Sequence, residues 1–495
     1  MRKRLVGWMI SAAMVSGAAF ALESGDHALQ FVSSEDGTTQ PYRLYVPSAV
    51  ANQTSLPLVV VLHGWGVDEI AWFKFTPVKR IAEEFGFVVA APYARGNWWY
   101  RGPAEHDIVD VVEDVRKRLR IDPDRIYLAG HSMGGWGTWW IGSRHPNLFA
   151  AIAPMSGFDP QDFVLNCVNL APFVIHDQLD DIVPVSFSRR PVQRMAELGI
   201  SHQYREEIGY GHASRMIGEN LPRVFEWFRA HPRVGRPQRC AIATRVGQRN
   251  RWLALLKTET WPKLARLDAV AEKNGHIRIN ADNVASFALH VSELPTSSGV
   301  PLRIAIGDWQ TTLSATKGWA VFEAHGAMDS PKRSGPKQWS LAYQQTLPQQ
   351  APVPAIHGKI GTRLREAHAN GTLALVVAEI LRAYFHAEVC VLDSDKIRVA
   401  AGELTTQKLL DAWVHPVERL ARIKLTREEI LGLNESISKG KPLVVPPAES
   451  LPKRRKLTVI LPTLLAAQIP DWEKRAEIVS DSLNETLCEL ATRGR

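Results

Sequence analysis

Long apolar runs are scarce in this sequence of 495 residues. The apolar stretch that follows Arg2, Lys3 and Arg4 ends near Ala21 and is shorter than a bilayer-spanning helix usually is. Three cations before such a stretch, with small residues at Ala19 and Ala21, are typical of a secretory signal. We therefore expect cleavage after Ala21, a secreted or periplasmic product and no membrane span in the mature chain; an uncleaved N-terminal anchor is the alternative.

Cysteine is also rare, with only Cys167, Cys240, Cys390 and Cys488. No two of them are close enough in the sequence to form a metal knuckle, so we expect no metal site. An even number in an oxidising compartment allows disulfides in three pairings. Of these we favour a bond between Cys390 and Cys488.

Charge is unevenly distributed. The formal net charge is +8, yet residues 22–232 hold 19 Lys and Arg against 25 Asp and Glu, so the basic excess lies in the later residues. Dispersed cations of this kind are typical of an ordinary solvated surface, and we expect no nucleic-acid partner. Binding of an anionic polymer or surface is the alternative.

The pattern of apolar residues divides the chain into several regions. Residues 22–232 alternate short β-rich runs with amphipathic helical stretches, which predicts an α/β domain with a mostly parallel sheet and helices on both faces. Residues 233–330 contain strand-like runs separated by turn signals, which predict a small β-sandwich-like module. Pro, Ser and Lys in 331–357 indicate a linker. Residues 358–495 mix helical and strand patterns, so we expect an α+β C-terminal domain.

The run Gly130-His131-Ser132-Met133-Gly134 has the pattern G-x-S-x-G. Alone it is a weak signal, but here it follows the strand-like RIYLA and precedes the helical GGWGTWWIGSRH. A strand, a tight turn and a helix in this order expose a serine hydroxyl above the edge of a sheet. The sequence therefore predicts Ser132 as a nucleophile.

A serine hydroxyl is a poor nucleophile at neutral pH and needs a base, which in turn needs an acid to fix its tautomer. In the expected chain order the acid comes next, and APFVIHDQLDDIVPV supplies Asp180 and Asp181 after a predicted strand. We choose Asp180. The base is then His212, on the glycine-bracketed loop in EEIGYGHASR; His63, His131, His176 and His202 compete with it.

A tetrahedral intermediate needs two hydrogen-bond donors for its oxyanion. We expect the backbone amides of Met133, directly after the nucleophile, and Trp65, in the loop after LPLVVVLHGWG. Aromatic side chains offer large flat contact areas to a substrate. We expect such contacts from Trp98 and Trp99, in the loop after GFVVAAPYA, and from Trp136; packing in the protein interior is the alternative for all three.

Residues 28–232 resemble secreted esterases of the α/β-hydrolase superfamily, the group of feruloyl esterases, acetyl-xylan esterases, polyhydroxybutyrate depolymerases and related predicted peptidases. The motifs that carry the resemblance are LPLVVVLHGWG, IDPDRIYLAGHSMGGWGTWW, HPNLFAAIAPMSG, HDQLDDIVPV and GYGHAS. The acid loop of that family usually reads His-Gly-x-x-Asp, and here Asp177 replaces the glycine while the register to Asp180 is kept. The resemblance implies the fold and the Ser-His-Asp arrangement but leaves the substrate open.

Residues 358–495 resemble, more distantly, the C-terminal domain of 5′-nucleotidases. GTRLREAHA, AEILRAYF, KIRVAAGELTTQKLLDAW, HPVERLARIKLTREEIL and LTVILPTLLAAQIPDW follow its order. The Asp-x-His and Gly-Asn-His motifs of the metal-binding partner domain are missing from the sequence. Because a fold does not by itself carry a function, we interpret this region as a non-catalytic accessory domain of unknown ligand.

Together these patterns predict a secreted serine hydrolase that cleaves small or polymeric carboxylic esters through an acyl-enzyme, without a cofactor. Two alternatives stay open. One is a serine peptidase of the prolyl-oligopeptidase type. The other is a nucleotide- or polymer-binding protein with an idle hydrolase domain.

Overall fold

The computed structural model describes most of the chain up to residue 351 and parts of the region after it. The described ranges are 22–48, 55–158, 161–261, 263–297, 299–314, 317–325, 337–351, 358–385, 389–393, 420–436, 442–447, 456–462 and 471–480, with the single residues 387, 451 and 491. The predicted signal, residues 1–21, and Cys488 lie outside them. Within these ranges, no helix combines the length and the apolar character that crossing a membrane requires.

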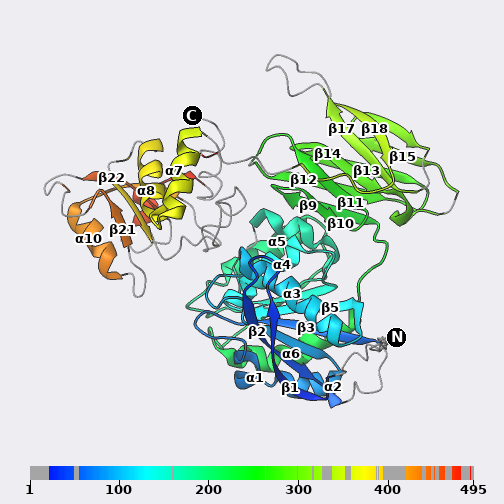
Figure 1. Cartoon of the computed structure of the whole chain (residues 1–495), viewed down its shortest axis with the longest axis horizontal. Helices are drawn as coiled ribbons and strands as arrows, with labels where there is room; N and C mark the ends of the chain where they lie inside the picture. The colour runs from blue at the N-terminus through cyan, green and yellow to red at the C-terminus, as the bar shows by residue number, and fades with distance from the viewer. Residues whose placement is uncertain are drawn as a thin grey trace, which may run out of the picture.

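An eight-stranded sheet with the order β1-β2-β4-β3-β5-β6-β7-β8 forms the centre of the first domain (Figure 1). Its strands are β1 (Gly25–Val32), β2 (Thr39–Val46), β3 (Leu56–Leu62), β4 (Val88–Pro92), β5 (Ile121–His131), β6 (Ala151–Met155), β7 (Phe173–Asp177) and β8 (Gln203–Glu207). The predicted opening pair, β1 and β2, is antiparallel, and β4 to β8 run parallel to β3. All seven residues of β3 are buried, because helices cover both faces of the sheet.

The helices of this domain pack against the sheet in two apolar cores, one on each face. Alternate residues of β3 point to opposite faces, so Val60 and Leu62 join one core while Val59 and Val61 join the other. The helices of the domain are α1 (Ala71–Phe75), α2 (Val78–Phe85), α3 (Pro103–Arg118), α4 (Met133–Arg144), the 3₁₀ segment η2 (Gln161–Asn169), α5 (Ser186–Glu197) and α6 (Ser214–Ala230). Helices α3, α4 and α5 supply the first core, and α1, α2 and α6 supply the second. This is the α/β architecture that the sequence predicts.

Two five-stranded sheets follow, with the orders β16-β15-β13-β12-β9 and β10-β11-β14-β17-β18. The strands are β9 (Arg239–Thr244), β10 (Gln248–Asn250), β11 (Leu253–Thr258), β12 (Ala265–Ala271), β13 (His276–Asp282), β14 (Val284–His290), β15 (Leu302–Ile306), β16 (Trp309–Leu313), β17 (Trp319–His325) and β18 (Gln338–Gln344), with the short 3₁₀ turn η3 (Val291–Glu293). Leu267 and Ile304 of one sheet and Phe287 and Phe322 of the other share one core, so the sheets form a sandwich.

The prediction of a linker over 331–357 was wrong where β18 lies. The strand spans Gln338–Gln344 and pairs antiparallel with β17. Its Trp339 is buried against Phe287 in the core of the sandwich. Because Pro-, Ser- and Lys-rich residues precede it, the short alternation of apolar and polar residues in this strand was not recognised.

The described parts of the C-terminal region contain α7 (Gly358–Ala369), α8 (Leu373–Tyr384), α10 (Arg427–Ser436) and α12 (Trp472–Arg475). Five short strands form a sheet of order β21-β19-β22-β20-β23: β19 (Val389–Asp393), β20 (Leu420–Leu425), β21 (Pro442–Val445), β22 (Leu457–Pro462) and β23 (Glu477–Ser480). The motif KIRVAAGELTTQKLLDAW lies outside the described residues. Cys167, Cys240 and Cys390 are buried free thiols, which contradicts the expected disulfide between Cys390 and Cys488.

Candidate active site

Ser132 lies in a sharp turn between β5 and α4. Its backbone has φ of 59° and ψ of −120°, a strained conformation for a residue with a side chain. The Ser132 amide donates a hydrogen bond to the Met155 carbonyl at 3.0 Å, which ties the turn to the neighbouring strand β6. Strain of this kind is common in turns that project a reactive side chain away from the backbone.

The glycines on either side of Ser132 allow the turn to be this tight. A Cβ atom on Gly130 would lie 2.2 Å from the Gly134 carbonyl oxygen, and one on Gly134 would lie 2.1 Å from the Leu62 carbonyl oxygen of β3. Both distances are far below any van der Waals contact. The G-x-S-x-G spacing is therefore a packing requirement between β5, α4 and β3.

His212 contacts Ser132 directly. It lies in the loop between β8 and α6, and its Nε2 atom is 2.8 Å from the Ser132 Oγ atom. Its Nδ1 atom is 2.7 Å from Asp180 Oδ2. Because an ionised carboxylate can only accept, Nδ1 carries the proton, and Nε2 is left to accept the hydrogen bond from the serine hydroxyl.

Asp180, in the loop after β7, is placed to orient His212. Its Oδ1 atom accepts hydrogen bonds from the Ile182 and Val183 amides at 3.0 and 2.8 Å, which leaves Oδ2 facing the imidazole. Burial opposes the charge of Asp180, but hydrogen bonds from His176, His212 and Val183 outweigh it and hold the pKa of the carboxyl well below its usual range. The neighbouring Asp181 is exposed to solvent.

The competing histidines have other partners. The ring nitrogens of His63 lie 2.8 Å from the carbonyl oxygens of Gly64 and Tyr93. His176 contacts the Ser188 hydroxyl and the Val183 carbonyl, and its Nε2 atom is 3.4 Å from Asp180 Oδ2. His176 thus supports the acid, a contact that the sequence did not reveal. His202 contacts the carbonyl of Ile200.

His131 lies beside His212, and the centroids of the two imidazole rings are 4.7 Å apart. Burial, together with the nearby His212, lowers the pKa of His131 to about 3. His131 is therefore neutral at physiological pH. A neutral neighbour does not repel the positive charge that His212 acquires when it takes a proton.

Two backbone segments approach the Ser132 side chain. Met133 is the first residue of α4, where the positive end of the helix dipole lies and where amides have no partner within the helix. The loop His63–Gly66 passes on the other side, because a Cβ atom on Gly64 would lie only 3.7 Å from Ser132 Cβ. Both predicted oxyanion segments, at Met133 and at Trp65, therefore border Ser132.

A pocket of about 270 Å³ opens at Ser132 and His212. Apart from these two residues and His131, its walls are mostly apolar. They include Trp65, Val67, Trp72, Phe75 and Ile217, which come from the loop after β3, from α1 and from α6. Trp65 and Phe75 are 43% and 56% exposed, so apolar surface continues to the mouth of the pocket. The pocket thus offers an apolar compartment beside the reactive hydroxyl.

The structure does not bring the three predicted substrate-contact tryptophans into this pocket. Trp99 and Trp136 are buried in the first core, where the Trp136 indole donates a hydrogen bond to the Trp99 carbonyl at 3.1 Å. Trp98 is half-buried against the same core. Sequence reasoning missed Trp72 and Phe75; their position directly after the oxyanion loop was the available signal. Among the described side chains, no group of three or more His, Cys, Asp or Glu residues is arranged to hold a metal ion.

Comparisons with known proteins concern the first domain. Residues 40–162 match the family described as Esterase PHB depolymerase. A bifunctional acetylxylan esterase/xylanase of Neocallimastix patriciarum is 34% identical over 129 residues, which cover 25% of this chain and 19% of the relative. Feruloyl esterase B of Neurospora crassa is 29% identical over 125 residues, 23% of this chain and 42% of the relative.

The crystal structure of a thermostable esterase is 29% identical, with a TM-score of 0.37, and the match covers 42% of this chain and 63% of that one. The chain spans less than half the length of the curated relatives named above. The family match includes the Ser132 turn and ends before Asp180. Residues 40–162 of this protein are thus similar to carboxylic ester hydrolases of the family described as Esterase PHB depolymerase.

Proposed function

We propose that the first domain is a serine hydrolase that cleaves carboxylic esters through an acyl-enzyme intermediate. The observation that carries this proposal is the continuous hydrogen-bonded chain from Ser132 Oγ through His212 to Asp180, with distances of 2.8 and 2.7 Å. The chain ends in a pocket, so a substrate can reach the hydroxyl. The similarity of residues 40–162 to esterases supports the choice of ester over other acyl substrates.

In this mechanism His212 takes the Ser132 proton as Ser132 Oγ attacks the ester carbonyl carbon. The carbonyl oxygen becomes an oxyanion, which the amides of Met133 and Trp65 stabilise. His212 then gives the proton to the departing alkoxide, and the alcohol leaves. Water, deprotonated by His212, attacks the acyl-enzyme; collapse of the second intermediate releases the carboxylic acid and returns the proton to Ser132.

Asp180 keeps its charge throughout, because its pKa lies well below the pH range of the reaction. The fixed carboxylate stabilises the imidazolium form of His212 and selects the tautomer that accepts from Ser132. The apolar walls formed by Trp72, Phe75 and Ile217 favour a substrate whose acyl or alcohol part is apolar. We propose export of the enzyme on the basis of residues 1–21, and a non-catalytic accessory role for the region after residue 358.

The test is active-site labelling with a fluorophosphonate together with hydrolysis of p-nitrophenyl esters. The native protein is expected to be labelled, and Ser132→Ala is expected to lose labelling and at least about 10³-fold in kcat. Ser156→Ala, which removes another buried serine hydroxyl, is the matched control and should keep both. Labelling of the Ser132→Ala protein at the native rate would contradict the assignment. A parallel panel of aminoacyl p-nitroanilides separates an esterase from a peptidase.

A further inference from the structure

The loop between β4 and α3, residues 93–102, has an unusual backbone. Six of its residues have positive φ, and four of these, Ala94, Arg95, Trp99 and Tyr100, are not glycine. Each non-glycine residue in this region is strained relative to an ordinary backbone conformation. Such a loop keeps its shape only when contacts outside it impose the conformation.

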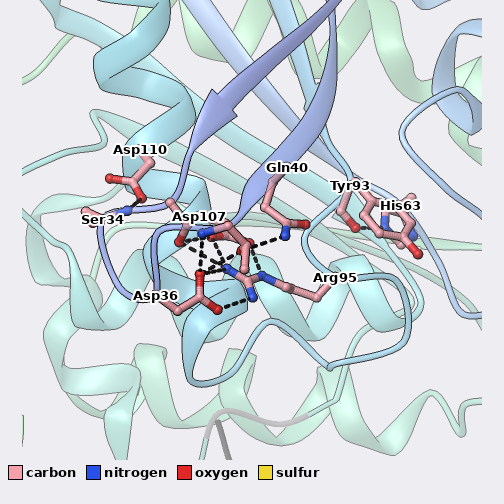
Figure 2. A network of polar contacts seen from close by, with 10 residues as sticks. Ser34, Asp36, Gln40, His63, Tyr93, Arg95, Asp107 and Asp110 are labelled. Atoms are coloured by element: carbon pink, nitrogen blue, oxygen red, sulfur yellow. Dashed lines mark hydrogen bonds and ion pairs between the residues drawn. The ribbon is translucent and has the colours of Figure 1, made fainter. Parts of the chain in front are cut away.

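The Arg95 side chain makes several of these contacts, which Figure 2 shows. Its Nε and Nη2 atoms donate to the two carboxylate oxygens of Asp107 in α3 at 2.6 and 3.0 Å. Its Nη1 and Nη2 atoms donate to Asp36, in the turn between β1 and β2, at 2.6 and 3.1 Å. Nη2 also lies 3.0 Å from the Ser33 hydroxyl. The guanidinium thus binds two carboxylates at once, and we name this group the Arg95 clamp.

The clamp extends from the interior to the surface. Asp107 is fully buried and Arg95 is partly buried, whereas Asp36 is exposed. The hydrogen bond from Arg95 holds the pKa of Asp36 well below its usual range. Paired charges with fixed geometry resist displacement more than a single hydrogen bond does. The clamp therefore holds one end of the strained loop against α3 and the β1–β2 turn.

The same loop holds the oxyanion loop, His63–Gly66, at both ends. At its start, the His63 Nε2 atom lies 2.8 Å from the Tyr93 carbonyl, and the Tyr100 hydroxyl donates to the His63 carbonyl at 2.8 Å. At its end, the Gly66 amide donates to Asn97 Oδ1 at 2.8 Å. Figure 2 shows His63 against Tyr93 close to the Arg95 clamp.

We propose that Asn97 and Arg95 are positioning residues of the oxyanion site. Asn97 fixes the Gly66 peptide and so sets the direction of the preceding amide, that of Trp65. Arg95 holds Asn97 in place through the strained backbone between them. The inference rests on the proposed function, because it assigns these residues a role in stabilising the oxyanion that the ester reaction forms.

The physical reason is preorganisation. An oxyanion donor is effective when it points at the developing charge before the reaction begins, and small displacements of a donor lower the rate strongly. Gly66 has φ of 79°, and a Cβ atom there would meet no neighbour, so packing does not restrain this residue. The hydrogen bond from Gly66 to Asn97 supplies that restraint.

The first test compares Asn97→Ala with Asn274→Ala. Asn274 is a matched control, because its Oδ1 atom also accepts a backbone amide, that of His276, in an exposed turn of the sandwich. Asn97→Ala is expected to lower kcat about 10- to 50-fold with less than a threefold change in KM, since a misplaced donor acts on the transition state. It should weaken inhibition by a trifluoromethyl ketone, whose adduct with Ser132 carries an oxyanion, by a similar factor. Asn274→Ala should leave all three values unchanged.

The second test asks whether Arg95 acts through Asn97. Arg95→Lys keeps the charge but cannot bind both carboxylates in a fork, so a smaller loss of kcat is expected. In the double variant Arg95→Lys/Asn97→Ala, the two losses of kcat should be less than additive, because both substitutions release the same Gly66 peptide. Circular dichroism and thermal unfolding show whether each variant is folded. If Arg95→Lys does not fold, the Asn97→Ala result decides the proposal by itself.

The outcomes separate the two proposals. If the native protein hydrolyses esters, Ser132→Ala is inactive and folded Asn97→Ala keeps the native kcat and ketone inhibition, then Asn97 has no positioning role while the proposed function stands. A native protein that neither hydrolyses esters nor reacts with the fluorophosphonate overturns the proposed function, and the positioning role with it. A fall in kcat and ketone affinity in Asn97→Ala but not in Asn274→Ala supports the inference.

Discussion

At the scale of single residues, Ser132, His212 and Asp180 form a continuous chain of hydrogen bonds. Asp180 accepts two backbone amides and the His212 imidazole, and His176 lies behind it. Sequence order was sufficient to choose Asp180 and His212. It did not reveal His176, because the support of one side chain by another depends on how two loops fold together.

Asp177 differs from the esterase family that residues 28–232 resemble, which usually has glycine at this position. Its carboxylate is fully buried, and it accepts the Leu179 amide through Oδ1 and the Tyr210 amide through Oδ2, both at 2.8 Å. Leu179 precedes the acid Asp180, and Tyr210 lies two residues before the base His212. The Asp177 side chain therefore connects the acid loop to the base loop.

We expect Asp177→Gly to lower kcat about 10-fold and to reduce the free energy of unfolding by about 2 kcal/mol, because two partly buried amides lose their acceptor. Asp177→Asn keeps one acceptor oxygen and should fall between the native protein and Asp177→Gly. Ester hydrolysis at saturating substrate and thermal unfolding measure the two effects. Native kcat in a folded Asp177→Gly protein would show that the loops are held by other contacts.

At the scale of elements, the position of the nucleophile follows from the close approach of α4 to the sheet. Gly134 of α4 touches the Leu62 carbonyl of β3, and Gly135 of α4 lies against the Met155 carbonyl of β6. Helix α4 can start directly above the strand ends only because both residues lack a side chain. The Met133 amide is then presented next to Ser132.

The matching prediction is that Gly134→Ala destabilises the first domain by about 3 kcal/mol, because its Cβ atom would overlap backbone that cannot move alone. Gly235→Ala is the control, since a Cβ atom there meets nothing within 4 Å. Its unfolding temperature should stay close to the native value. Equal unfolding temperatures for both variants would contradict the close packing of α4 on β3.

At the scale of the whole molecule, the first domain and the sandwich are joined by side-chain amides. Asn166 of η2 donates to the Ala243 carbonyl of β9 at 2.9 Å and accepts the Ala243 amide. Asn147 makes the same kind of pair with Arg249 and Arg251. Asparagine can donate and accept at once, so it continues the hydrogen bonding of an edge strand without belonging to the sheet. The family match ends at residue 162, so it includes Asn147 but not Asn166.

Acid stability is a property of the whole fold, and we expect His131 to contribute to it. Its pKa falls from 6.5 to about 3 on folding, so below pH 6.5 the unfolded chain binds a proton that the folded protein does not. Stability is therefore lost as the pH falls from 6.5 towards 3. Between pH 7 and pH 5 this group should remove about 2 kcal/mol from the free energy of unfolding. Carboxylates contribute mainly at lower pH, because their unfolded pKa is about 4.

His131→Gln removes the titrating group while keeping a polar side chain of similar size. Its free energy of unfolding, measured by urea titration of the tryptophan fluorescence, should change less between pH 7 and pH 5 than that of the native protein. His202→Gln, on the partly buried chain before β8, is the control and should keep the native slope. A native slope in His131→Gln would assign the acid sensitivity to another group.

The sequence by itself determined the elements of the first domain and the order of Ser132, Asp180 and His212, because strand and helix periodicity and glycine spacing are local. It also indicated most strands of the sandwich, but not β10, β16 or β18, whose pairing depends on a partner strand. Tertiary structure alone decided which aromatic residues line the pocket. Trp98, Trp99 and Trp136 pack in or against the core, whereas Trp72 and Phe75 line the pocket at Ser132. The direction of a side chain on a loop or short helix depends on what that segment packs against. The Arg95 clamp likewise joins residues from three segments, and no local sequence pattern predicts it.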